Sequence, residues 1–421
     1  MTLTKNGRHI FNEVPNGYPI PGRTTIYDGS QSIDLANVPL DGGFLITTLD
    51  LAVDPYLRSM MDQVSNSHVT PFQLGEPLVN YGIGLVLRSE YSEAQPGDHV
   101  YGLIPFQEYS VLKDFENQIE RMRVLKNDVG LPWSVYLGAA GMPGQTSYMA
   151  WKAYAKAKPG DVAFITSGAG TVGSLVIQLA KRDGMKVISC ASSEEKLQYL
   201  SSLGADVTYN YRTTSAREVL EKEGPIDIYW DNVGGETLEA ALDNASTGAR
   251  FLESGMMSGY NEQHLPIRNL FKLIGMQVTM QGFLVWSLVD QYRDEFYREF
   301  VPLLASGDIK YREDITHGLE TVGEVLLDVQ RGKNFGKDEQ LCRLQSQGEV
   351  EQKKANAVEA AADALETLVD TWTTAPSGVD QARTIVNFAA SHQLAPHGAK
   401  KNGQHTGNES RRAVSSSSKA L

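Results

Sequence analysis

The feature that most constrains the fold is a glycine pattern between a short apolar run and a helical pattern. The run Val162–Ile165 is typical of a buried parallel strand, and Gly168, Gly170 and Gly173 follow it with the spacing G-x-G-x-x-G. Val172–Lys181 then continues with apolar residues at helical spacing. Glycines in such a turn permit a tight bend, close approach of the backbone to a pyrophosphate, and close packing of helix on strand. The pattern predicts a dinucleotide site, with the phosphates at the helix N-terminus.

The next strand indicates which dinucleotide fits. It runs from 186 to 190 and ends about 20 residues beyond the glycines, where NAD-binding chains usually carry an acid for the ribose 2′-hydroxyl. Here the chain has Ser192 and Ser193 instead, and Lys196 follows one turn into the next helix. Because hydroxyls and a cation suit a 2′-phosphate, we expect NADP(H). Alternatively, Lys196 is a solvated helix residue, since Ser192 and Glu195 also have the spacing of a capping box.

Length and composition favour a cytoplasmic enzyme. The 421 residues, 41% of them hydrophobic, leave room for two domains and an extension. No apolar stretch approaches the roughly 20 residues that span a bilayer, and Met1–Glu13 lacks the apolar region of a signal peptide. The net charge of −13 argues against general nucleic-acid binding. The two cysteines, Cys190 and Cys342, provide neither a disulfide framework nor a cysteine-based zinc site.

The sequence pattern divides the body of the chain into three regions. Residues 1–132 contain short alternating runs between turn residues, which predict a small β-barrel-like domain. Residues 133–300 alternate strand and helix patterns, which predicts a doubly wound parallel sheet with ligands at the carboxyl ends of its strands. The strand candidates are 162–167, 186–190, 206–210, 226–231, 249–254 and 278–283. Residues 301–341 return to mixed short elements.

A fourth region, residues 342–421, has a different composition. Glu349–Trp372 is rich in alanine and charge, with an apolar stripe at helical spacing. From Pro396 the chain is basic and rich in glycine, serine and asparagine. This composition predicts an extension that is first helical and then disordered. A helix that docks a partner is the alternative.

Six motifs in a fixed order give the chain a family resemblance. They are Asp54–Arg58, Gly141–Thr146, Ser167–Gly173, Asp231–Gly235, Ser258–Asn261 and Asn334–Lys337. Together they resemble the medium-chain dehydrogenase/reductase superfamily, in the zinc-independent branch of leukotriene/prostaglandin reductases and NADPH-dependent alkenal double-bond reductases. The resemblance covers about residues 10–337. It implies a homodimer whose GroES-like domain is built from both ends of the enzyme body, with a Rossmann domain inserted between them.

The resemblance also implies which residues contact the cofactor. Gly170, Thr171, Val172 and Gly173 would cradle the pyrophosphate, and Lys196 with Tyr211 would hold the 2′-phosphate. The rest of the cofactor path would be lined by Asn232, Ser254, Gly255, Ser258, Tyr260, Phe283, Leu284, Val285 and Asn334. Asn232 and Ser254 directly follow predicted strands, where an α/β sheet binds ligands. The role of Asn334 rests on the resemblance alone.

The residues available restrict the chemistry. The first domain has no cysteine, and the eight histidines lack ligand spacing, so we expect no metal site. Together with this expectation, the resemblance implies reduction of the polarised C=C bond of an α,β-unsaturated ketone or aldehyde, with hydride delivered to the β-carbon and negative charge developing on the carbonyl oxygen. The small-molecule substrate would belong either to detoxification or to a biosynthetic tailoring step. An NADPH quinone reductase and an NADPH-binding docking protein without turnover are the alternatives.

Two tyrosines are candidates for assisting this reaction. Tyr260 can donate to the developing enolate oxygen or relay a proton, or it can only orient the cofactor or substrate. Tyr56 can place its ring in the cleft or pack on the seam between the domains. Solvent can also supply the α-proton. Two features depart from the family pattern: 338–343 is a poor sequence for a central strand, and Glu253 stands where an apolar residue would be easier to bury.

Overall fold

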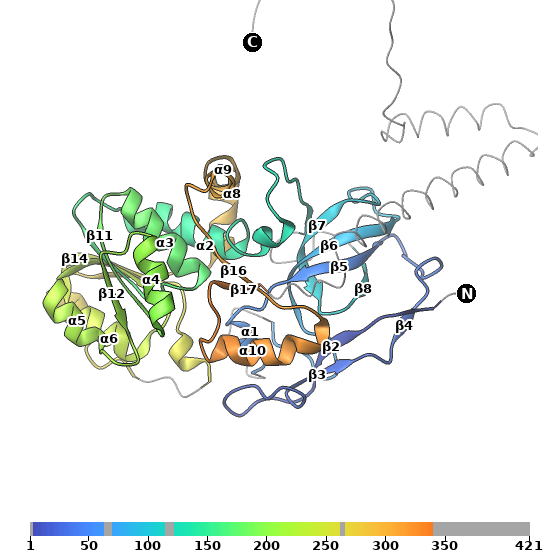
Figure 1. Cartoon of the computed structure of the whole chain (residues 1–421), viewed down its shortest axis with the longest axis horizontal. Helices are drawn as coiled ribbons and strands as arrows, with labels where there is room; N and C mark the ends of the chain where they lie inside the picture. Colours follow the sequence, from blue (N-terminus) through green and yellow to red (C-terminus); the bar gives the residue numbers. More distant parts are fainter. Residues whose placement is uncertain (1–2, 63–69, 114–121, 262–265, 340–421) are drawn as a thin grey trace, which may run out of the picture. The chain divides into compact units, whose positions relative to one another are not determined.

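The middle of the chain forms one parallel sheet in the computed structural model, which describes residues 3–62, 70–113, 122–261 and 266–339 (Figure 1). Its strands are β10 (Val162–Ile165), β11 (Lys186–Ala191), β12 (Val207–Asn210), β13 (Ile226–Asp231), β14 (Ala245–Glu253) and β15 (Thr279–Gly282). Their order is β12-β11-β10-β13-β14-β15. The chain therefore starts at β10, fills one side of the sheet, and then returns to fill the other. All six predicted strands are confirmed, and the order is that of a doubly wound Rossmann domain.

Helices connect these strands. They are α3 (Thr171–Arg182), α4 (Glu194–Ser202), α5 (Ala216–Glu223), α6 (Gly235–Asp243) and α7 (Lys272–Gly275). The predicted helix start at Ser192 is off by one residue: the N-cap of α4 is Ser193, whose side chain accepts a hydrogen bond from the N–H of Lys196. The backbone of Ser193 is extended, as an N-cap requires.

The first region forms an antiparallel sheet with the strand order β8-β5-β6-β7-β9. These strands are β5 (Phe44–Leu51), β6 (Val79–Ser89), β7 (His99–Pro105), β8 (Tyr109–Leu112) and β9 (Arg123–Val124). Two further antiparallel pairs join β1 (Thr4–Lys5) to β4 (Ser32–Ile33), and β2 (Arg8–Phe11) to β3 (Thr25–Asp28). The sheet agrees with the β-barrel-like domain predicted from the alternating runs, which the family resemblance implies is GroES-like.

The remaining elements are short. They are α1 (Leu57–Met60), η1 (Trp133–Leu137), α2 (Met142–Ala150), η2 (Trp151–Ala155), η3 (Met257–Gly259), η4 (Val285–Ser287), α8 (Val289–Glu295), η5 (Phe296–Phe300), α9 (Val301–Ser306), η6 (Leu319–Thr321) and α10 (Val322–Gln330). Two last strands, β16 (Glu313–Ile315) and β17 (Lys337–Glu339), pair in parallel. The poor strand sequence after Asn334–Lys337 thus forms a strand up to Glu339.

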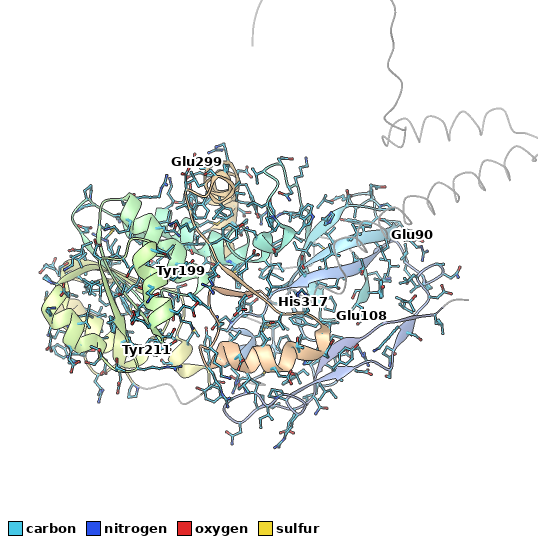
Figure 2. All side chains as sticks on the ribbon, viewed as in Figure 1. Glu90, Glu108, Tyr199, Tyr211, Glu299 and His317 are labelled. Atoms are coloured by element: carbon cyan, nitrogen blue, oxygen red, sulfur yellow. The ribbon has the colours of Figure 1, made fainter. Side chains whose placement is uncertain are left out.

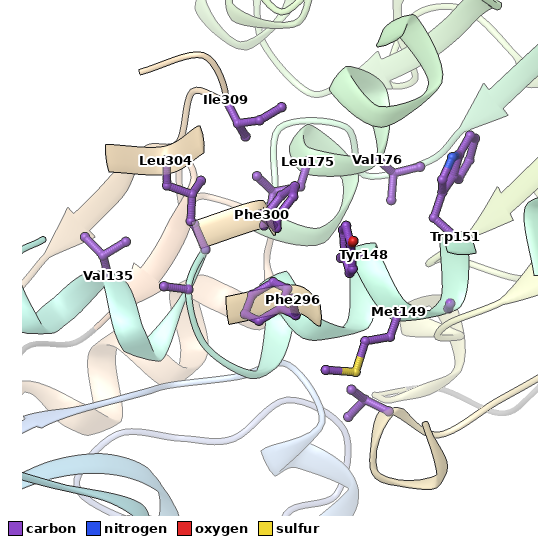
Figure 3. Close-up of a cluster of buried hydrophobic side chains, with 14 of the residues drawn as sticks. Val135, Tyr148, Met149, Trp151, Leu175, Val176, Phe296, Phe300, Leu304 and Ile309 are labelled. Carbon is purple, nitrogen blue, oxygen red and sulfur yellow. The ribbon is translucent and has the colours of Figure 1, made fainter. Parts of the chain in front are cut away.

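Two cores position the site. Figure 3 shows part of the larger one, where α2, α3, η5 and α9 bury apolar side chains such as Tyr148, Leu175, Phe296 and Leu304. The second core lies in the first domain, and α10 contributes Val322, Leu326 and Val329 to it. The chain therefore returns to the first domain after the Rossmann sheet. The domain boundaries at 132, 300 and 341 stay predictions.

The helical and disordered segments predicted for 342–421 lie outside the described residues. Across the described part of the chain, no helix combines the length and hydropathy needed to cross a membrane.

Candidate active site

The glycine turn joins β10 to α3, and its backbone leaves no space for side chains. A Cβ on Gly173 would lie 2.4 Å from the carbonyl oxygen of Ser167 and 2.9 Å from Cα of Gly168. A Cβ on Gly168 would lie 2.1 Å from Oγ of Ser189 on β11. Gly170 is the N-cap of α3, and the Ser167 carbonyl oxygen, at 3.4 Å, is the one atom of the described residues that would lie within 4 Å of its Cβ. Gly168 and Gly173 are thus needed for packing, whereas Gly170 leaves the helix N-terminus open to a ligand.

A cavity of about 200 Å³ lies against this turn. Its wall combines Val53, Asp54 and Pro55 of the first domain with the turn, the end of β11 and the segment 332–336. Many of the predicted cofactor residues meet there: Gly170, Thr171, Val172, Gly173, Ser192, Lys196, Tyr211, Asn232 and Asn334. The cavity lies at the carboxyl ends of β10, β11 and β13. The strand order reverses between β10 and β13, and open α/β sheets bind ligands at such a point.

Lys196 is buried in this cavity and is not a solvated helix residue. It is 8% exposed, and its Nζ donates to the carbonyl oxygen of Gly332 at 2.9 Å and to Oγ of Ser192 at 3.5 Å. Tyr211 lies close to the same carbonyl, because its hydroxyl would be 3.5 Å from a Cβ built on Gly332. Gly332 follows the C-terminal end of α10, and Figure 2 labels Tyr211. The alternative that Lys196 is a solvated helix residue is therefore wrong.

The cavity opens into a larger one of about 810 Å³. The two share Ser167, Cys190, Tyr211, Met257 and Gly332, so they form one continuous cleft. Arginines 212 and 331 also line the larger part. The cleft thus runs from the first domain, past the glycine turn, to a region with several cations.

The residues present fit a dinucleotide phosphate. Among the described residues, Oγ1 of Thr171 is a buried hydroxyl without a hydrogen-bond partner, and it belongs to the first residue of α3. The first N–H groups of a helix also have no partners within the helix and attract anions. A bound pyrophosphate would satisfy both, and the Lys196 ammonium would neutralise a phosphate nearby.

The segment 332–336 covers the glycine turn from the other side. The N–H of Gly336 donates to the carbonyl oxygen of Ala169 at 3.0 Å. Phe335 packs edge-on against Tyr199 with a centroid separation of 5.4 Å, and the Arg312 guanidinium lies 3.5 Å from its ring centroid. This packing holds Asn334 in the cavity wall, where its amide donates to the Gly336 carbonyl oxygen at 3.4 Å.

Asn232 is fixed at the point where the sheet reverses. Its N–H donates to Oγ1 of Thr166 at 2.9 Å, and its side-chain amide donates to the Thr166 carbonyl oxygen at 2.7 Å. These bonds tie the end of β13 to the end of β10. They orient Asn232 towards the cavity that it lines.

Several predicted cofactor residues lie away from the smaller cavity. The N–H groups of Ser254 and Gly255 donate to the Asp231 carbonyl oxygen at 2.9 and 3.0 Å. Ser258 lines the larger cavity. The Phe283 ring packs edge-on against Trp230 with its centroid 5.7 Å away, beside the partly buried Leu284 and the buried Val285. Cofactor contacts at these residues stay predictions.

The two candidate tyrosines occupy different surroundings. The Tyr260 hydroxyl would be 3.7 Å from a Cβ on Gly255, and burial raises the pKa of Tyr260, so it stays protonated at neutral pH. Tyr56 lines a separate cavity of about 70 Å³ together with Met60, Thr70, Val79, Asn80, Tyr81, Leu103 and Trp286. Its hydroxyl donates to Oδ1 of Asn80. Because Asp54 and Pro55 line the nucleotide cavity, the segment 54–56 contributes to the walls of both cavities.

Sequence reasoning missed a pair of buried acids beneath Asn232. Asp231 and Glu253 are register partners at the ends of β13 and β14. Oδ1 of Asp231 accepts from the Tyr229 hydroxyl and from the N–H groups of Val233 and Gly234, all at 2.8 Å. Burial raises the pKa of both carboxyls, and the proximity of Asp231 raises that of Glu253 further. Glu253 therefore keeps its proton at neutral pH. The alignment of the two predicted strands was the available signal.

No cluster of three potential metal-ligating side chains occurs in the ranges that the structure describes. Of the two cysteines, Cys190 is a free, buried thiol, and burial raises its pKa to about 11. Cys342 lies outside the described ranges.

Comparison with known proteins agrees with the geometry of the cleft. Residues 24–119 match the N-terminal domain of oxidoreductase family, and residues 171–306 match the zinc-binding dehydrogenase family. The chain is 36% identical over 337 residues to the 2-alkenal reductase (NADP(+)-dependent) of Nicotiana tabacum, covering 79% of this chain and 96% of that protein. It is also 36% identical over 304 residues to the (+)-pulegone reductase of Mentha piperita, covering 70% and 86%.

A solved structure extends this comparison to the cofactor. CurA of Vibrio vulnificus, crystallised in complex with NADPH, superposes with a TM-score of 0.71 at 30% identity and covers 79% of this chain and 97% of its own. With the fit of the cleft to a dinucleotide phosphate, these similarities identify an NADP-dependent oxidoreductase. The chain belongs to the zinc-independent medium-chain dehydrogenase/reductase superfamily, in its alkenal double-bond reductase branch.

Proposed function

We propose that the protein reduces the C=C bond of α,β-unsaturated ketones or aldehydes with NADPH. The observation that carries this proposal is the position of the segment 54–56 between two cavities. Asp54 and Pro55 line the cavity at the glycine turn, and Tyr56 lines a small apolar cavity. The similarity to alkenal and pulegone reductases, both named for conjugated carbonyl substrates, supports the same reaction class.

The chain's own residues divide the work of binding. The N-terminus of α3 and the Thr171 hydroxyl would hold the pyrophosphate, and Lys196, Ser192 and Tyr211 would hold the 2′-phosphate. No carboxylate stands at the end of β11 to repel that phosphate. Asn232 and the segment 332–336 would line the rest of the cofactor path. When bound, NADPH supplies a hydride for the β-carbon of the substrate.

Tyr260 is the candidate donor to the substrate oxygen. Conjugation moves negative charge onto the carbonyl oxygen as the β-carbon is reduced, and a hydrogen-bond donor placed there stabilises the charge. Because burial raises its pKa, the phenol keeps the proton that this role requires. Tyr260→Phe should lower kcat by about tenfold, equivalent to about 1.4 kcal/mol, while leaving the Kd for NADPH almost unchanged. An equal loss in both would assign Tyr260 to cofactor binding instead.

The position of an isotopic label tests the reaction. The purified enzyme is incubated with NADPH deuterated at the transferred position and with benzylideneacetone, and the product is analysed by NMR. We expect the saturated ketone with deuterium on its β-carbon. An allylic alcohol with deuterium on the former carbonyl carbon would show that the protein is an alcohol dehydrogenase.

We also propose that the protein is a cytoplasmic homodimer. Support for the dimer comes from β15, which ends the Rossmann sheet, and from the nearby side chains of Phe271 and Ile274, which are 67% and 85% exposed. Light scattering of the purified protein should give the mass of two chains, and Ile274→Asp should shift it towards one. A monomer at micromolar concentration would contradict the dimer.

A further inference from the structure

The last residue of α10 is a buried glutamine at a position where the helix pattern favours an apolar side chain. Val322, Leu326 and Val329 pack in the first-domain core, and Gln330 follows Leu326 at the i,i+4 spacing of one helix face. Gln330 is only 9% exposed. Burying an amide costs free energy unless its polar atoms find hydrogen-bond partners. The partners of Gln330 therefore indicate what an amide does at this position.

The Gln330 amide bridges two segments that lie far apart in the sequence. Its nitrogen, Nε2, donates to the carbonyl oxygen of Pro55 at 2.9 Å, and its oxygen, Oε1, accepts from Nδ2 of Asn261 at 2.8 Å. A backbone carbonyl can only accept, so the NH2 group has to face Pro55 and the amide oxygen has to face Asn261. Both ends of the amide thus have partners, which offsets the cost of burying it.

The bridge joins the wall of the cleft to the segment that carries Tyr260. Pro55 lies in the first domain and lines the nucleotide cavity, as does Met257 of η3. Gln330 lines the larger cavity. Asn261 directly follows Tyr260, the candidate donor to the substrate oxygen. The two hydrogen bonds of Gln330 therefore connect this candidate donor to the first domain.

The position of Tyr260 depends on the backbone on both sides of it. Within the part of the chain that the structure describes, its hydroxyl has no hydrogen-bond partner. Before it, the N–H of Ser258 donates to the Val233 carbonyl oxygen at 3.0 Å, which ties the segment to the end of β13. After it, the bond from Asn261 to Gln330 ties the segment to α10. Loss of the second tie would leave the phenol held from one side.

We propose that Gln330 is a positioning residue for the reductase, which holds Tyr260 in place by tying its segment to Pro55. The proposal rests on the reductase function and on the role of Tyr260 given above, and it adds a residue that acts through Tyr260. A donor that stabilises a developing charge has to be held close to its productive geometry by its neighbours. The end of α10 is a firm anchor, because Val329, next to Gln330, is buried in the first-domain core.

The test measures kcat, KM and cofactor binding on the purified full-length enzyme, with NADPH and benzylideneacetone. Gln330→Met keeps the length and helix propensity of the side chain but removes both hydrogen bonds. We expect kcat to fall about three- to tenfold, as for one neutral hydrogen bond, while the Kd for NADPH and the KM for the enone change less than about twofold. Gln330→Glu keeps an acceptor for Asn261 but has no donor for Pro55 when it is ionised, so it should also lower kcat.

Gln178→Met is the matched control. Gln178 on α3 is another buried glutamine, whose amide nitrogen donates to the carbonyl oxygen of Lys310 and whose amide oxygen accepts from the N–H of Lys310, both at 2.8 Å. Its replacement should lower Tm about as much as Gln330→Met does and leave kcat unchanged. Thermal denaturation and NADPH titration show whether each variant is folded.

A double-mutant cycle separates the positioning of Tyr260 from general damage. Because Gln330 acts through Tyr260, Gln330→Met should change kcat by less than about twofold when it is added to Tyr260→Phe. Losses that multiply in the double variant would overturn the proposal. An unchanged kcat in both Gln330 variants would overturn it as well.

A spectroscopic measurement makes the test independent of turnover. 3-Fluorotyrosine is incorporated at position 260, and its 19F NMR signal is recorded in the complex with NADP+. Gln330→Met should shift or broaden this signal, whereas Gln178→Met should not. If no enone is reduced at all, the reductase function fails, and the 19F signal still decides whether Gln330 positions Tyr260. An unchanged signal in Gln330→Met refutes the positioning role.

Discussion

The nucleotide cavity and the Tyr56 cavity differ in how their walls are assembled along the chain. The first takes most of its wall from short contiguous stretches, such as 167–173 and 190–196, where a strand ends and a helix begins. The second combines the start of β6 with side chains from α1, β7 and η4, which lie far apart in the sequence. A phosphate site uses backbone N–H groups, which local sequence positions. A cavity for a small molecule uses side-chain shape and hydrogen bonding, which depend on distant contacts. The comparison suggests where local changes should act most strongly.

The largest effect should come from closing the glycine turn. Gly173→Ala places a Cβ against the backbone of Ser167 and Gly168, so the turn must move away from the phosphates. We expect NADPH affinity to fall on the order of a hundredfold, since overpacking costs about 1–3 kcal/mol. Fluorescence titration with NADPH measures the loss. Gly275→Ala, where a Cβ meets nothing within 4 Å, is the matched control. Normal NADPH affinity in Gly173→Ala would show that the turn does not hold the cofactor.

Lys196→Ala should weaken NADPH binding by tenfold or more. A charge-assisted contact contributes about 1.5–3 kcal/mol, and NADH, which lacks the 2′-phosphate, should bind almost as before. The ratio of the two Michaelis constants is the measurement. Lys186→Ala, which removes a cation paired with Glu223 at the opposite end of β11, should leave the ratio unchanged. If the unmodified enzyme uses both cofactors equally, the assignment of the 2′-phosphate site fails.

A buried histidine should make the first domain sensitive to acid. His9 bridges the Leu319 carbonyl oxygen and the Thr25 hydroxyl, and burial lowers its pKa to about 4, although the bond to Leu319 opposes this shift. Below pH 6.5 the unfolded chain takes up a proton that the folded state refuses until about pH 4, so stability falls as pH falls through this window. The loss should be about 1–2 kcal/mol between pH 7 and pH 5.

Thermal denaturation across this pH range measures the effect. His9→Gln should flatten the pH dependence, whereas His317→Gln, at an exposed position, should not. Because His9 anchors the segment that leads into α10, loss of the bridge should also loosen the 332–336 wall of the nucleotide cavity. An unchanged pH profile in His9→Gln would mean that this contact between distant segments does not control stability.

The smallest effect concerns the acid pair under Asn232. The raised pKa of Glu253 means that the folded state keeps a proton which the unfolded chain releases above about pH 4.5. The contribution of this proton to the free energy of unfolding is therefore complete at low pH. It is lost as pH rises towards the pKa of Glu253 in the folded state. Glu253→Gln keeps a donor to Asp231 at every pH, so it should become relatively more stable as pH rises, by about 1 kcal/mol. Glu236→Gln, an exposed change nearby, is the control. A constant difference in Tm from pH 5 to pH 9 would contradict the raised pKa of Glu253.

The fold was accessible from the sequence because its signals are local. Each Rossmann strand is an apolar run followed by a helical pattern, and tertiary contacts did not override these patterns. Only the helix start shifted, from Ser192 to Ser193, because neighbouring serines offer the same cap chemistry. Two long-range contacts could not be predicted from the sequence. Packing of α10 places Val322 in the same first-domain core as Phe11. The Lys196 ammonium donates to the backbone carbonyl oxygen of Gly332, a contact that no residue type marks.

By itself, the sequence determined the nucleotide half of this protein: the glycine turn, the missing acid after β11, and the cation at Lys196. Backbone geometry and charge specify such a site, and both are encoded in neighbouring residues. The tertiary structure decided the direction of the hydrogen bond at Tyr56, the pairing of Asp231 with Glu253 across two strands, and the burial of Lys196. Each of these depends on a partner brought close by folding. Hydrogen-bond direction and pKa follow from neighbours in space, which the order of residues along the chain does not specify.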